Sequence, residues 1–204
     1  MECHMSRITS LLTRFDPETG KVEGVQGVSR RLADLRGAFA DPVAFEEALH
    51  KDNPIVYTVS SVTPGDGKGD LHYGVGVLFP GTVGQEYYLT KGHLHSWREA
   101  AEIYVGLHGE GRMLLEDEAT KESTVVELLP NSTVYVPGHT MHRTINVGPV
   151  PLLYIGIYPA DAGHDYREIA KRNFRTVIVE KEGKPVVMDR EEYMRSLPQM
   201  KTGR

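Results

Sequence analysis

The 204-residue chain has one cysteine, Cys3, one tryptophan, Trp97, and no long run of apolar residues. A single cysteine excludes an intrachain disulfide, which agrees with a reducing compartment. No stretch approaches the roughly 20 apolar residues of a membrane span. Residues 1–15 also lack the apolar core of a signal peptide. We therefore predict a cytoplasmic protein with no membrane partner.

Clusters of basic residues are also missing. The chain has 23 Lys and Arg against 28 Asp and Glu, a net charge of -5, and no segment gathers the cations. Nucleic-acid phosphates are held chiefly by clustered cations, so we predict no nucleic-acid partner. The length suits one domain, and a hydrophobic content of 40% is enough to bury a core.

Glycine and proline are plentiful, at 21 and 12 residues, and they recur between short apolar runs. Such spacing favours many strands and turns over a helix bundle. Eight strands are predicted: 55–60, 73–79, 103–108, 112–116, 124–128, 133–136, 143–147 and 152–158. Strands of this number and spacing are typical of a closed barrel or a double-sheet jelly roll, so the predicted fold class is all-β.

The sequence divides into an N-terminal extension, a barrel and a C-terminal tail, at residues 1–53, 54–190 and 191–204. In the extension, apolar residues at helical spacing predict one helix over residues 30–40. A second helix is predicted from Asp41, which can cap it, with Pro42 at its first position. Beyond the strands, a short helix over 165–172 and a late hairpin turning at Glu182 and Gly183 are predicted.

A possible metal site begins with His93 and His95. Residues two apart on a strand point to the same face, so both imidazoles can reach one ion. A carboxylate, Glu102, then opens a strand, and a third histidine, His142, follows a distant turn. A second carboxylate, Glu99, competes for the fourth position. We prefer Glu102, because its strand then ends at the turn of Gly109, and we expect Glu99 to face water.

Together these residues resemble the two motifs of the cupin superfamily. The first matches at His93, His95, Glu102 and Gly109, and the second at Pro137, His142 and Asn146. Asn131 and His139 stand where the second motif usually has glycine. The resemblance implies a cupin β-barrel, a double-stranded jelly roll. Three imidazoles and a carboxylate accept one divalent ion of Fe, Mn, Ni, Zn or Co, and spacing does not choose among them.

Three stretches further resemble the cupin-type phosphoglucose isomerases known from archaea and some bacteria. They are residues 79–95, 101–105 and 158–166, and with the second motif the resemblance covers roughly residues 55–180. It implies a homodimer that interconverts glucose 6-phosphate and fructose 6-phosphate. Physical chemistry agrees, because a divalent ion can stabilise an enediolate and a carboxylate can move the proton. A hydride shift stays open, because a metal-bound carboxylate is a poorer base.

The resemblance also implies roles for single residues. The metal ligands fall on His93, His95, Glu102 and His142, and Glu102, His164 and Tyr104 are the predicted catalytic residues. Substrate and phosphate contacts fall on Tyr57, Thr90, Gly92, Tyr158 and Tyr166. At one position the chain departs from the family, because Gly76 stands where a phosphate-binding threonine is expected.

Strand alternation raises a question at Thr90. Strict alternation groups Lys91 with His93 and His95 and turns Thr90 to the other face. For Thr90 to point inward, the strand must bulge near Gly92, which glycine permits.

Two other functions fit a cupin barrel. Three histidines and a glutamate also bind catalytic Fe(II), so an oxygenase is one alternative. A non-catalytic sugar-phosphate-binding protein is the other, and Gly76 leaves room for it. Trp97 is interpreted as a packing residue or dimer contact. The five remaining histidines lack partners at ligand spacing and are interpreted as structural or surface residues: His4, His50, His72, His108 and His139.

Overall fold

The short apolar runs form three antiparallel sheets in the computed structural model, which describes residues 12–198. The six-stranded sheet contains, in order, β1 (Val28–Arg31), β2 (Ile55–Val62), β3 (Leu71–Leu78), β11 (Leu152–Pro159), β6 (Glu102–His108) and β9 (Thr133–Val136). The three-stranded sheet contains β10 (Thr140–Asn146), β7 (Gly111–Asp117) and β8 (Ser123–Leu128). A smaller sheet contains β13 (Lys184–Asp189), β12 (Thr176–Lys181), β5 (Glu86–Tyr87) and β4 (Thr82–Val83).

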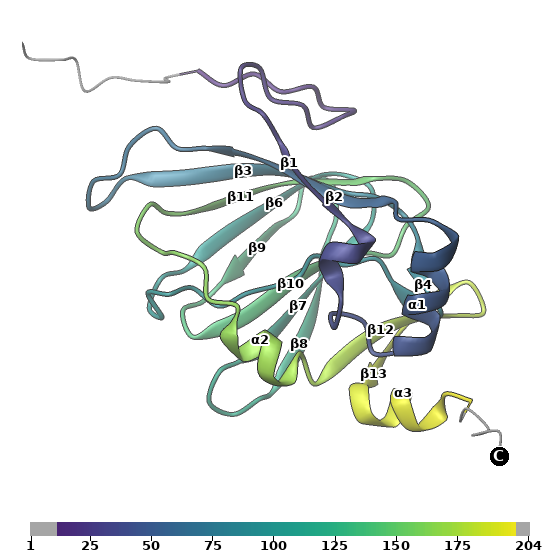
Figure 1. Ribbon diagram of the computed structural model, residues 1–204. Coiled ribbons are helices and arrows are strands. Elements are labelled where there is room, and N and C mark those ends of the chain that lie inside the picture. Colours follow the sequence, from purple (N-terminus) through teal and green to yellow (C-terminus); the bar gives the residue numbers. More distant parts are fainter. Residues whose placement is uncertain (1–11, 199–204) are drawn as a thin grey trace, which may run out of the picture.

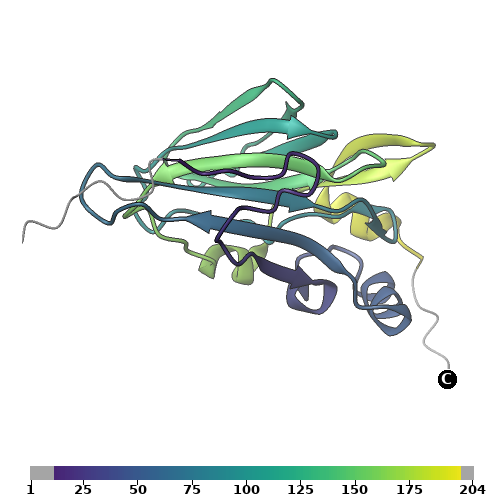
Figure 2. The ribbon, with the colours of Figure 1, turned by 90° about the horizontal axis from the view of Figure 1, so that it is seen from above.

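The two larger sheets form the layers of the molecule (Figure 1). Their facing side chains meet in one apolar core, which includes Leu78 and Leu152 from the six-stranded sheet and Met113 and Leu128 from the three-stranded sheet. Figure 2 shows the same layers from above, with the β12–β13 hairpin of the small sheet at one end. The predicted all-β cupin barrel is confirmed.

The predicted helix over residues 30–40 is wrong. Arg30 belongs to β1, and only Leu32–Leu35 are helical, as a single 3-10 turn. Leu32 and Leu35 are both buried, and their spacing of three residues suits a 3-10 helix as well as an α-helix. The second helix is confirmed as α1 (Pro42–Lys51), with the Asp41 carboxylate accepting from two backbone N–H groups of its first turn.

The C-terminal part of the chain supplies two strands of the small sheet and two short helices. The predicted helix is present as α2 (Arg167–Arg172), and the predicted hairpin is β12–β13, with Glu182 and Gly183 both at positive φ. A further helix, α3 (Arg190–Ser196), was not predicted. Because β1 pairs with β2, part of the N-terminal extension joins the main sheet. The three-segment division of the sequence stays a prediction. Within residues 12–198, no helix is long and apolar enough to cross a membrane.

Candidate metal centre and active site

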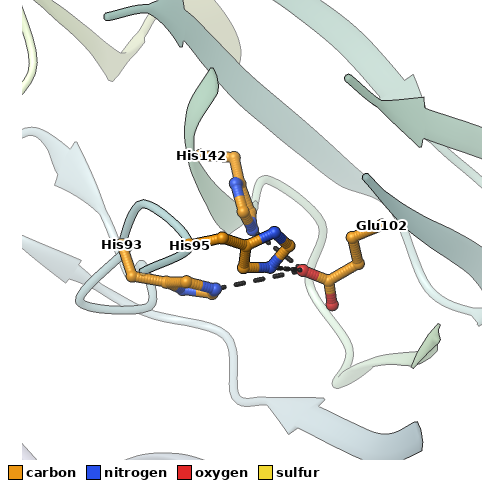
Figure 3. A group of neighbouring side chains, drawn as sticks. All are labelled: His93, His95, Glu102 and His142. Carbon is orange, nitrogen blue, oxygen red and sulfur yellow. Dashed lines mark hydrogen bonds and ion pairs between the residues drawn. The ribbon is translucent and has the colours of Figure 1, made fainter. Parts of the chain in front are cut away.

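The four predicted ligands come from both layers of the barrel. Glu102 begins β6 of the six-stranded sheet, and His142 lies in β10 of the three-stranded sheet. His93 and His95 lie in the connection between β5 and β6, where His93 forms a bridge with His142. Figure 3 shows the Glu102 carboxylate directed at the three imidazoles. The barrel therefore brings residues 49 positions apart to one point, since 142 − 93 = 49.

The ligand atoms of these residues all lie within 4.8 Å of one another. The Glu102 Oε2 atom lies 3.0 Å from His142 Nε2, 3.3 Å from His95 Nε2 and 3.9 Å from His93 Nε2. Glu102, His95 and His142 are almost completely buried. Glu99, the competing carboxylate, is exposed in the preceding turn. The geometry therefore selects Glu102.

The hydrogen bonds around the imidazoles fit a metal ion. His95 Nδ1 lies 3.0 Å from the Ala100 carbonyl oxygen, and His142 Nδ1 lies 3.0 Å from that of Thr140. With a cation bound, each Nδ1–H can donate to its carbonyl while Nε2 offers its lone pair to the cation. His93 Nε2 is buried and has no hydrogen-bond partner in the described structure. Four convergent donors of these types can hold a divalent ion.

The environment sets the charges of these groups. Burial alone would raise the pKa of the Glu102 carboxyl, but hydrogen bonds from His142 and His95 hold it well below its usual range. Burial lowers the pKa of His93 well below its ordinary value. Glu102 is therefore ionised and His93 neutral near pH 7, as metal ligands must be. Burial raises the pKa of Tyr104 well above its ordinary value, so its hydroxyl keeps its proton.

The expected bulge is present near Gly92. Leu89 forms a bridge with Ile145, and His93 forms one with His142. The chain therefore advances four residues from Leu89 to His93, while β10 advances only three between the same two bridges. Gly92 has a φ of 77°, and a Cβ there would lie 2.9 Å from the His142 carbonyl oxygen. Only glycine combines this φ with this close approach.

The bulge turns both Thr90 and His93 toward one cavity. The Thr144 N–H donates to Thr90 Oγ1 at 3.0 Å, which leaves the Thr90 hydroxyl hydrogen free. The buried Arg143 side chain supports the bulge, because its guanidinium donates to the Lys91 carbonyl oxygen at 2.8 Å.

The cavity has a volume of about 280 Å³ and lies between the layers. Part of its wall is backbone, because Gly74 and Gly156 contribute no side chain. A Cβ on Gly156 would lie 2.7 Å from Glu102 Oε1, and one on Gly74 would lie 3.2 Å from a Val59 methyl. The glycines therefore keep the space beside the metal cluster open.

Of the four predicted ligands, His93, Glu102 and His142 line this cavity. The other predicted site residues line it too: Tyr57, Thr90, Gly92, Tyr104, Tyr158, His164 and Tyr166. The His164 ring lies 4.4 Å from that of His93 between centroids, and it stacks on Tyr166 at 6.2 Å. The Tyr104 hydroxyl is a hydrogen-bond partner of Glu102. Their positions agree with the predicted roles, and the roles themselves stay predictions.

One arginine joins the two loops of the site. Arg98 donates to the His95 carbonyl oxygen, to Asp165 Oδ2 at 2.7 Å and to Glu118 Oε1 at 2.9 Å. Leu94 and Asp165 also exchange two backbone hydrogen bonds. The segment that carries His95 and the segment that carries His164 are therefore fixed to each other. The sequence showed only an arginine after the histidine pair, with no sign of this link.

Among the cavity residues that were not predicted are three with polar side chains: Arg30, Lys91 and Tyr154. Arg30 lies in β1, a strand in a segment where a helix was predicted. Lys91 was assigned to a strand face rather than to the cavity rim, where its Nζ lies 4.8 Å from the centre of the Tyr166 ring. The alternation of Tyr154, Gly156 and Tyr158 along β11 was the available signal for Tyr154, because alternate strand residues share a face.

Four of the five remaining histidines, all within the described residues, lie outside the cavity wall. His50 and His72 bond to backbone carbonyls, at 2.7 Å and 2.8 Å. His108 is exposed, and His139 is exposed with a φ of 58°. The prediction for His4 lies outside the described residues. Trp97 is 45% exposed and does not line the cavity. Asn131, like His139, takes the positive φ expected where glycine is usual.

The comparisons with known proteins identify the family of the chain. The family model for glucose-6-phosphate isomerase matches residues 29–195. The glucose-6-phosphate isomerase of Pyrococcus abyssi is 42% identical over 176 residues, 86% of this chain and 93% of that protein. The enzyme of that name from Thermococcus litoralis is 43% identical, over 86% and 92%. A solved oxalate oxidase has a TM-score of 0.47 at 16% identity over 56% of each chain, too distant to bear on activity. With its metal-ligand cluster and cavity inside the matched region, the chain belongs to the glucose-6-phosphate isomerase family, on a cupin barrel.

Proposed function

We propose that this protein interconverts glucose 6-phosphate and fructose 6-phosphate with the help of one divalent metal ion. The observation that carries the proposal is a single cavity in which three residues of the four-ligand cluster, His93, Glu102 and His142, lie together with hydroxyl donors and cationic side chains. Aldose–ketose isomerisation needs this combination, because one end of the substrate carries the reacting oxygens and the other a phosphate. The family of the chain supports the same substrate pair.

His93, His95, Glu102 and His142 would hold the ion. When bound, a divalent cation would polarise the sugar oxygens and stabilise negative charge that develops on them. The mixed nitrogen and oxygen donors accept Fe, Mn, Ni, Zn or Co. Elemental analysis of purified protein should find up to one divalent ion per chain. Finding none after incubation with each of these five metals would reject the site.

Three side chains would handle the sugar and its protons. Glu102 is ionised, so it can accept a proton from one sugar carbon and return it to the next. Tyr104 keeps its proton and can donate a hydrogen bond to a sugar oxygen. Burial lowers the pKa of His164, so its imidazole is neutral near pH 7 and can accept a hydroxyl proton during ring opening. A hydride shift would need only the orienting roles of these residues.

The phosphate would bind near the Gly92 bulge. Thr90 has a free hydroxyl hydrogen, and the Tyr57 hydroxyl is held by the backbone of Lys91. Tyr158 lines the cavity with its hydroxyl bonded to Ser61, and a phosphate can compete for that bond. Such a site uses hydroxyls and backbone donors, as many phosphate sites do.

A coupled assay tests the function. Glucose 6-phosphate should form from fructose 6-phosphate, disappear after treatment with a chelator and return when metal is added. Consumption of O₂ with substrate would indicate an oxygenase instead. Binding of fructose 6-phosphate without turnover at any metal would indicate a sugar-phosphate-binding protein.

We also propose a homodimer in the cytoplasm. Ile103 and Tyr135 are directly paired on β6 and β9 and are 39% and 62% exposed. Exposed apolar pairs on a sheet face favour contact with another protein surface. Light scattering on the purified protein should give twice the chain mass of 22.7 kDa, and a monomer would contradict the proposal. A glycolytic reaction supports the cytoplasmic location.

A further inference from the structure

The edge strand β1 is held in place without contributing to the core. All four of its side chains are exposed, and Val28 is 55% exposed. Its register pairs Val28 with Val59 and Arg30 with Tyr57, and all four of these residues line the cavity. Residues two apart on a strand share a face, so β1 directs Val28 and Arg30 toward the cavity. The side chains of β1 therefore contribute to the cavity wall and not to the apolar core.

Arg30 is a cation without a carboxylate partner. Its side chain bonds to the Tyr57 hydroxyl, and no Asp or Glu of residues 12–198 forms an ion pair with it. Lys91, on the same cavity wall, likewise has no ion pair within the described part of the chain. Two unpaired cations beside hydroxyl donors can attract and bind an anion.

The neighbouring arginine has its own partners. Arg31 donates to the Asn53 carbonyl oxygen at 2.7 Å, and its backbone N–H bonds to the Asp34 carboxylate at 2.8 Å. A register shift between Arg30 and Arg31 separates the two side chains, and Arg31 does not line the cavity. Of the two adjacent arginines, therefore, only Arg30 lines the cavity.

The charges along the cavity are divided between its ends. Glu102 and the three histidines lie where β6 begins, while Arg30 is level with Tyr57, near the opposite end of the same sheet face. A phosphate monoester carries a charge of about −1.5 to −2 at pH 7, so it is attracted to unpaired cations. Sugar oxygens and phosphate would thus be drawn to different ends.

We propose that Arg30 is a specificity-determining residue, which binds the phosphate of the substrate directly. The inference rests on the proposed function and adds a residue from outside the predicted barrel to its substrate site. Arginine suits the role, because its planar guanidinium can donate two parallel hydrogen bonds to phosphate oxygens. The hydrogen bond between Arg30 and Tyr57 orients the guanidinium before the phosphate binds.

The test compares Arg30→Gln with Arg31→Gln. Both remove one exposed arginine from the same strand, so they change the net charge equally. For Arg30→Gln, KM for fructose 6-phosphate should rise about tenfold or more, because a charge-assisted hydrogen bond is lost. The inhibition constant for inorganic phosphate should rise with it, while kcat changes less than KM. Arg31→Gln should match the wild type in all three values.

Two further measurements separate a phosphate contact from a structural effect. Arg30→Lys keeps the charge, so it should recover part of the affinity lost in Arg30→Gln. Added salt should raise KM more steeply in the wild type than in Arg30→Gln, since screening weakens an attraction that the variant lacks. Circular dichroism and metal content should be the same in all four proteins.

The possible failures are distinguishable. If the wild type isomerises fructose 6-phosphate but Arg30→Gln and Arg31→Gln behave alike, the role of Arg30 is wrong and the proposed function stands. If the wild type shows no isomerase activity, the proposed function fails. Calorimetry with inorganic phosphate then decides whether Arg30 binds an anion: equal affinity in the wild type and Arg30→Gln would reject it.

Discussion

The ring of Tyr154 occupies the space that any side chain at Gly76 would need. The two residues are direct partners on β11 and β3, and a Cβ on Gly76 would lie 2.6 Å from the Tyr154 hydroxyl oxygen. The Tyr154 hydroxyl is bonded to Thr144 and lines the cavity. Where related proteins are expected to place a threonine hydroxyl on β3, this chain places a tyrosine hydroxyl from the adjacent strand. Gly76 is therefore no reason to expect an inactive protein.

Removing that hydroxyl should weaken substrate binding. Tyr154→Phe keeps the ring over Gly76, so we expect a folded, metal-binding protein. KM for fructose 6-phosphate should rise several-fold, up to about tenfold, because a hydrogen bond is worth about 0.5–1.5 kcal/mol, and kcat should change less. Steady-state kinetics measures both. Tyr135→Phe, on the exposed outer face, is the control and should equal the wild type. Unchanged KM in Tyr154→Phe would reduce Tyr154 to a packing residue.

The two carboxylates near the histidines should differ sharply in their effect on activity. Glu102→Gln should lower kcat at least about 10²-fold, because a general base is lost from the centre of the cluster. Activity must be measured at saturating metal, since the same change removes a ligand. Glu99→Gln, in the exposed turn, should alter the rate less than a few-fold. A normal rate in Glu102→Gln would exclude it as the base, and full metal content with lost activity would favour proton transfer over a hydride shift.

Alanine variants of two glycines with nearly the same φ can distinguish the effect of backbone strain from the effect of steric crowding. Gly183 has a φ of 75°, and a Cβ added there would have nothing within 4 Å, whereas Gly92 has a φ of 77° and crowded surroundings. Gly183→Ala should lower stability by about 1–2 kcal/mol, the cost of a left-handed non-glycine residue. Gly92→Ala should cost more and should also reduce activity, because the bulge carries Thr90 and His93. Urea denaturation and the isomerase assay measure the two effects. Equal losses of stability in both variants would contradict the close approach seen at Gly92.

Arg98 should hold the metal-binding segment in place. Arg98→Gln removes its ion pairs with Asp165 and Glu118 and its bond to the His95 carbonyl. We expect faster loss of metal to a competing chelator and a lower kcat even at saturating metal, because His164 is no longer fixed relative to His95. Arg112→Gln, which removes a surface ion pair with Glu127 outside the cavity, is the matched control. If both variants release metal at the wild-type rate, the link between the segments does not support the ligands.

The grouping of His93, His95, Glu102 and His142 could be predicted from the sequence, and their role as metal ligands stays a prediction. His93 and His95 share a face, and the turn at Gly109 fixed which carboxylate opens β6. The bulge was also predictable, because Thr90 could face inward only if Gly92 interrupted the alternation. Both inferences needed two things: the order of residues within short segments, and the resemblance to the family.

The rest of the site depends on contacts between strands that local pattern does not encode. Arg30 was assigned to a helix because the spacing of Leu32 and Leu35 fits one. In the structure Arg30 pairs with Tyr57 on β2 and is part of a strand. Tyr154 was missed for a similar reason, since its importance appears only when β11 and β3 are side by side and Gly76 is found beneath its ring. The link from Arg98 to Asp165 spans 67 positions in the chain.

The glycines of the cavity wall have a consequence for changing this protein. Gly74 and Gly156 already have the smallest possible side chain, so no substitution at these positions can enlarge the cavity. Any replacement makes it smaller, and at Gly156 it would push directly on Glu102. A broader substrate range must therefore be sought at Val28, Val59 or Tyr166, which border the space with side chains that can be shortened.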